Sequence, residues 1–131
     1  MHNIKGYKMN KFKSVAVVML VILSVVSLYA KDKTVEGELV DVTCNMAGAG
    51  GEKHLMCAIA CAKRGQPIGI AAKDGKIYTL LTMSPKLASL MQKHLKVTGA
   101  YDAASQSIKP SKIFVKEGKD WKEVDLPKLM M

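Results

Sequence analysis

The sequence predicts a mainly β domain with two helices, folded as a small barrel of five to six strands. Three observations predict it: short segments of alternating apolar and polar residues, turn signals between them, and an amphipathic segment between the third and fourth predicted strands. A helix at that place, in a domain of about 100 residues, is typical of an OB-like barrel. An open α+β sheet is the alternative that the same pattern allows.

The first strand is predicted over residues 34–43, where Val35 and Leu39 give apolar positions and Gly37 indicates a bulge. Residues 45–51 contain three glycines, which is typical of a flexible loop. An extra helix is expected after this loop. It ends before Gly65, the residue type that commonly follows a helix C-terminus.

The remaining elements follow from turn and capping signals. Asp74-Gly75 predicts a hairpin between strands at 67–72 and 77–81. Ser84-Pro85 predicts the start of the second helix, which is expected to run to Leu95. Three further strands are predicted over residues 96–101, 107–116 and 121–125.

The N-terminus has the pattern of a secretory signal peptide. Four lysines and no acidic residue precede an apolar run from Val15 to Leu28. Cleavage after Ala30 would leave residues 31–131 as one exported OB-like domain, in the periplasm or secreted. The alternative is an uncleaved segment that anchors the chain in the inner membrane.

Charge and composition exclude some functions. The full chain carries +9, and without the four signal lysines 16 basic residues face 11 acidic ones, which leaves +5. Nucleic-acid binding would require a basic stripe with stacking aromatics, and aromatic residues are sparse here. Asp41, Glu52 and Asp74 are isolated acids, expected in turns or at the surface. No hydrolytic or haem-binding motif occurs, so the sequence favours a binding protein over an enzyme.

The candidate site is formed by all three cysteines and one histidine. In the run His54-Leu-Met-Cys57-Ala-Ile-Ala-Cys61, the three donors occupy positions i, i+3 and i+7, which one helical face would bring together. Cys44 can add a fourth donor from the preceding loop. Three thiolates and an imidazole are ligands for zinc, and for copper(I), for which Met46 and Met56 are possible additional soft ligands.

Disulfide formation is the second hypothesis. Exported proteins commonly oxidise their cysteines, and Cys44 could bond to Cys57 or to Cys61. Because three is an odd number, one free thiol would remain, and the protein would then act as a thiol–disulfide partner of other exported proteins. Inert buried cysteines are the third possibility. His94 is expected at the end of the second helix, where a cationic side chain is favourable, and not as a ligand.

The motifs around these residues resemble those of a group of small exported bacterial proteins with an OB-like fold. The pattern is Cys44, then Gly-x-Lys-His-x-x-Cys-Ala-x-x-Cys ending at Cys61, then Gly-x-Pro-x-Gly and Asp-Gly-Lys-x-Tyr ending at Tyr78. The likeness covers roughly residues 36–101. It implies export and a Cys/His cluster that acts as a unit. The function predicted from the sequence is a small binding protein accessory to an exported or respiratory system. The likeness implies no reaction and no substrate.

Overall fold

The computed structural model describes residues 31–125; the predicted signal peptide at 1–30 and the end of the chain at 126–131 lie outside the described residues. Six strands form one sheet: β1 (Lys31–Asp41), β2 (Ile68–Ala72), β3 (Ile77–Leu80), β4 (His94–Asp102), β5 (Ser107–Glu117) and β6 (Asp120–Val124). The helical elements are α2 (Val42–Met46), the 3₁₀ turn η2 (Glu52–His54), α3 (Leu55–Lys63), α4 (Ser84–Leu87) and the 3₁₀ turn η3 (Ala88–Leu90).

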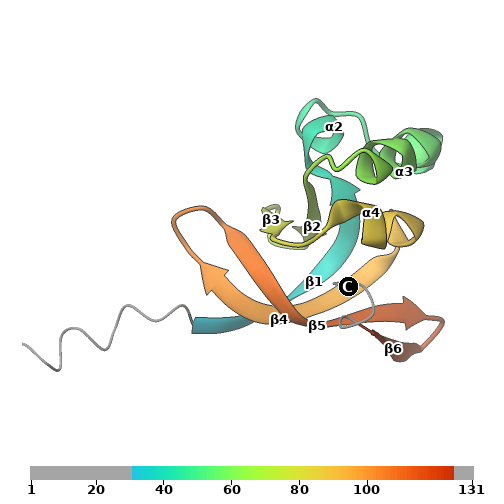
Figure 1. Cartoon of the computed structure of the whole chain (residues 1–131). Helices are drawn as coiled ribbons and strands as arrows, with labels where there is room; N and C mark the ends of the chain where they lie inside the picture. The colour runs from blue at the N-terminus through green and yellow to red at the C-terminus, as the bar shows by residue number, and fades with distance from the viewer. Residues whose placement is uncertain (1–30, 126–131) are drawn as a thin grey trace, which may run out of the picture.

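The first five strands close into a ring. The sheet order is β3-β2-β1-β4-β5-β6, and β3 also pairs with β5. The β3–β5 pairing is parallel and all the others are antiparallel. The strongly curved sheet is visible in Figure 1. The prediction of a mainly β, OB-like fold with a helix between strands 3 and 4 is therefore confirmed.

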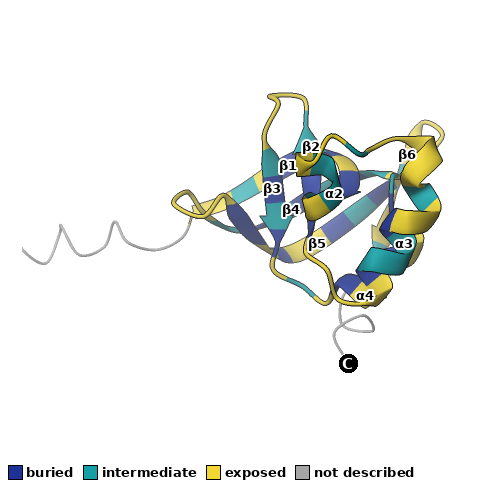
Figure 2. Ribbon diagram, turned by 90° about the horizontal axis from the view of Figure 1, so that it is seen from above, coloured by how far each residue is buried: buried dark blue, intermediate teal, exposed yellow. Residues whose placement is uncertain are grey.

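The core fills the inside of the ring because the strands alternate as expected. Leu95 and Val97 of β4 are fully buried and Lys96 between them is half-buried. Ile108 and Ile113 of β5 are also fully buried and lie on either side of the register shift between β4 and β5. Figure 2 shows the buried stripes along the strands and the exposed outer face of α3.

Two glycines allow close approaches between strands. A Cβ on Gly37 would lie 2.1 Å from the carbonyl oxygen of Ala71, and one on Gly99 would lie 2.1 Å from that of Lys109. Gly37 keeps an unbroken register with its partners, so the bulge predicted there is wrong. The register shift instead lies between Thr98 and Gly99, where β4 pairs with β5.

The second helix is shorter than predicted. After α4 and η3 the backbone turns at Gln92, which has a φ of 62°. The Gln92 backbone N–H donates a hydrogen bond to the Leu39 carbonyl at 2.7 Å, and β4 begins at His94. His94 is therefore not at a helix end. Its Nε2 lies 3.0 Å from Glu36 Oε1 on the neighbouring strand β1.

Residues 42–67, here called the insertion, connect β1 to β2 and carry α2, η2 and α3. The ladder between β1 and β2 continues to the base of the insertion. There Asp41 pairs with Ile68, and the Val42 N–H donates a hydrogen bond to the Pro67 carbonyl at 3.0 Å. Figure 1 places α2, α3 and α4 together at one end of the molecule. Within residues 31–125, no helix combines the length and apolarity required to cross a membrane.

Candidate metal centre

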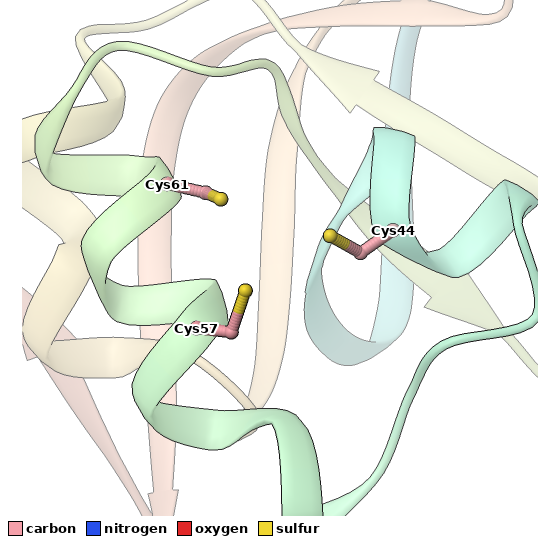
Figure 3. Close-up of side chains that lie close together, drawn as sticks. All are labelled: Cys44, Cys57 and Cys61. Carbon is pink, nitrogen blue, oxygen red and sulfur yellow. The ribbon is translucent and has the colours of Figure 1, made fainter.

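The structure brings the three cysteines of the chain together. Their sulfur atoms all lie within 4.8 Å of one another. In Figure 3, Cys57 and Cys61 extend from α3 toward Cys44 on α2. All three are free thiols, so neither the Cys44–Cys57 nor the Cys44–Cys61 disulfide is present.

Helix α3 presents its two cysteines because its neighbouring stripe is buried. Ala58 and Ala62 pack into the core at 6% and 0% exposure, four residues apart on one side of the helix. Cys57 and Cys61 precede them by one residue each, and so lie about 100° round the helix. The two alanines are small, which lets α3 lie close against α4 and η3.

Cys44 is positioned by a short helix and not by a flexible loop. Asp41 is the N-cap of α2, and its Oδ1 accepts a hydrogen bond from the Cys44 backbone N–H at 2.8 Å. The loop predicted over residues 45–51 therefore begins later, after Met46. Its glycines at positions 48 and 51 adopt φ values of 76° and 80°, which turn the chain from α2 into η2.

The environment keeps two of the thiols protonated at neutral pH. Partial burial, together with the negative charge of Asp41, raises the pKa of Cys44 to about 11. Burial also raises the pKa of Cys61, as does its hydrogen bond with Cys57. A cation bound between the sulfurs would replace these protons and favour the thiolates.

The spacing of the sulfurs fits a single soft metal ion after a small contraction. Zinc–sulfur bonds of about 2.3 Å in a tetrahedron put the sulfurs about 3.8 Å apart. The observed limit of 4.8 Å exceeds this by about 1 Å. Cys57 is exposed and Cys44 and Cys61 are half-buried, so rotations of their side chains meet little steric resistance.

His54 lies outside the group of sulfurs. It ends the 3₁₀ turn η2 and is the N-cap residue of α3, so it does not continue the helical face of Cys57 and Cys61. The expected single stripe is broken because the His54 backbone, with φ −106° and ψ 4°, is not α-helical. His54 is exposed and lines a cavity beside Cys44.

The two candidate methionines are both 78% exposed. Met46 lines a separate open groove of about 440 Å³, between α2, the β2–β3 hairpin and the loop before β5. Met56 is one residue from Cys57, which places it about 100° away round α3.

Sequence reasoning missed Asp41, which was expected in a turn or at the surface. Its side chain is only 3% exposed, and it lines the cavity of about 20 Å³ together with Cys44 and His54. Among the described residues, its Oδ2 is buried without a hydrogen-bond partner. The sequence does contain a signal for this role. Asp is a preferred N-cap, and an N-cap side chain bonds to the backbone N–H two or three residues later, which for Asp41 is that of Cys44.

Comparisons with protein-family models, with curated proteins and with solved structures found no match for this chain. Its function is therefore inferred from the geometry of the site.

Proposed function

We propose that this chain is a small exported binding protein that holds one metal ion, zinc or copper(I), through Cys44, Cys57 and Cys61. The observation that carries the proposal is the convergence of three free sulfurs from two separate helices. Scattered core cysteines would not meet in this way. Thiolates are the preferred protein ligands of both ions.

His54 is proposed as the fourth ligand of a tetrahedral site. It lies on the rim of the cavity beside Cys44, and the glycines before it allow the turn to move toward the sulfurs. A copper(I) site could use the three sulfurs alone, because this ion accepts fewer and softer ligands.

Metal content tests the proposal directly. The protein, purified from the exported fraction without added metal, should carry one zinc or copper ion per chain by elemental analysis and native mass spectrometry. After chelation, all three thiols should become alkylatable. Zinc and copper are distinguished by the same elemental measurement.

Single cysteine variants locate the site. Cys44→Ser, Cys57→Ser and Cys61→Ser should each lower metal affinity, because a hydroxyl is a poor ligand for a soft ion. Ala60→Ser is the matched control, since it adds a hydroxyl to the same helix without removing a sulfur. Equal metal content in all four variants would contradict the proposed ligands.

The thiol–disulfide function is the alternative outcome of the same measurement. A native mass two hydrogens below that of the reduced chain, without a metal ion, would support a protein that exchanges disulfides with exported partners. One thiol would then remain alkylatable without reduction, because the number of cysteines is odd.

Export is supported by the basic and apolar segments of the first 30 residues. Fractionation of cells and N-terminal mass analysis test it. A mature chain that begins at Lys31 in the periplasmic or secreted fraction is expected. The full-length chain in the membrane fraction would instead indicate the uncleaved anchor.

A further inference from the structure

The buried carboxylate of Asp41, next to the metal centre, has one of its two oxygen atoms without a hydrogen bond within residues 31–125. Asp41 is 3% exposed, and its Oδ1 is satisfied by the N–H of Cys44. Its Oδ2 is buried and has no partner in the part of the chain that the structure describes. Leaving such an atom unpaired is costly, so its retention requires an explanation.

The surroundings of this oxygen point toward the metal centre. Asp41, Cys44 and His54 line one cavity of about 20 Å³, which is large enough for roughly one water molecule or one polar group. Asp41 is also tied directly to one of the cysteines, since its Oδ1 accepts a hydrogen bond from the Cys44 backbone N–H at 2.8 Å. The carboxylate is therefore close enough to interact with an ion held between them.

Histidines that bind metals commonly donate their second ring N–H to a carboxylate, which fixes the orientation of the ring. We infer that Asp41 is a positioning residue of the proposed metal centre, where it accepts a hydrogen bond from metal-bound His54 and favours zinc over copper(I). This inference rests on the proposed function.

Charge balance gives the preference for a divalent ion. Three thiolates and the Asp41 carboxylate contribute four negative charges, of which zinc leaves two uncompensated and copper(I) leaves three. The attraction of Asp41 for zinc is twice its attraction for a monovalent ion at the same place. A site for copper(I) would gain less from a buried anion and would not need His54.

Asp41→Asn is the most direct test, because Asn keeps the shape and an oxygen that can cap α2. Zinc affinity should fall about 10- to 100-fold, as measured by competition with a chromophoric chelator. Copper(I) affinity, measured without oxygen, should fall less, because the ion carries half the charge of zinc. The change in binding free energy should be at most half as large, which corresponds to about a 3- to 10-fold loss of affinity. Glu38→Gln is the matched control, since Glu38 lines the same cavity but is exposed.

A double-mutant cycle with His54→Ala tests whether Asp41 acts through the histidine. If it does, adding Asp41→Asn to His54→Ala should lower zinc affinity much less than Asp41→Asn alone. The cobalt(II)-substituted protein gives a second readout, because the ligand-field spectrum should change when the imidazole is lost or reoriented.

Several results would overturn the inference. One is a double-mutant cycle in which the effects of Asp41→Asn and His54→Ala on zinc affinity simply add. Another is an equal loss of affinity for zinc and for copper(I) in Asp41→Asn. The third is a loss of zinc affinity in Asp41→Asn no larger than that in Glu38→Gln. Asp41→Ser, which retains a helix cap, replaces Asp41→Asn if that variant does not fold. A wild-type protein that binds neither ion would instead refute the proposed function, so the two failures are distinguishable.

Discussion

Gln92 is tied to Gly51: its side-chain Nε2 donates a hydrogen bond to the Gly51 carbonyl oxygen at 2.6 Å. Gln92 belongs to the connection between η3 and β4, and Gly51 precedes η2 in the insertion. The bond therefore fixes the start of the segment that carries His54 and Cys57 to the strand framework. It is a contact between residues 41 positions apart in the sequence.

Gln92→Ala should weaken metal binding without removing a ligand. One hydrogen bond of this kind contributes about 0.5–1.5 kcal/mol, so the loss in affinity should be about 2- to 10-fold. Gln106→Ala is the matched control, because Gln106 also has a positive φ, of 49°, but lies in the loop before β5. Equal affinities for the two variants, measured by chelator competition, would show that the Gly51 contact does not organise the site.

Metal affinity should rise steeply with pH. Both Cys44 and Cys61 have a raised pKa, so both are protonated at pH 7 and each loses a proton when the ion binds. Because the ion competes with at least two protons below these pKa values, affinity should increase by about 100-fold or more per pH unit between pH 6 and 8. Proton release, measured in weak buffer with a pH indicator, should exceed one proton per ion. Release of less than one proton would contradict the ligand assignment.

The double variant Met46→Leu/Met56→Leu should bind either ion nearly as well as the wild type. Both side chains are 78% exposed, and Met46 lines the groove near β3 and not the cavity beside Cys44. Leucine preserves size and apolarity, which isolates the effect of the sulfur. A loss of copper(I) affinity beyond 10-fold, in the same competition assay, would restore the methionines as ligands.

Gly37→Ala should destabilise the ring of strands. The new Cβ would lie 2.1 Å from the carbonyl oxygen of Ala71, a backbone atom that moves only if β1 and β2 separate. The expected cost is about 1–3 kcal/mol or more in the free energy of unfolding. Gly50→Ala is the control, because its Cβ would meet only the Asn45 side chain at 3.6 Å. Chemical denaturation of both variants measures the difference, and similar midpoints would refute the close approach.

The strands could be predicted from the sequence because burial in a sheet repeats every two residues. β4 shows this alternation from Leu95 onward, and Asp74-Gly75 marks the β2–β3 turn where it was expected. The end of the second helix was wrong because a tertiary contact decides it. Gln92 takes a left-handed backbone conformation, which its hydrogen bond to Leu39 stabilises.

The candidate site was predicted in part. The meeting of Cys44 with Cys57 and Cys61 follows from helical spacing and a compliant glycine-rich connection, and the structure shows it. Helix α2 was missed because it has five residues, two of them β-branched, and depends on the Asp41 cap. The burial of Asp41 depends on how the insertion folds back over β1, which sequence periodicity does not reveal.

The hydrogen bonds at the base of the insertion allow the insertion to differ in stability from the strands. Since Asp41 pairs with Ile68 and Val42 bonds to Pro67, the β1–β2 ladder is complete below the cysteines. Residues 43–54 are exposed or half-buried and precede the alanines that hold α3 in the core, so they can rearrange locally while the strands stay paired. Capture and release of an ion would then require only this segment to rearrange, and amide hydrogen exchange would slow there on loading while the strands change little.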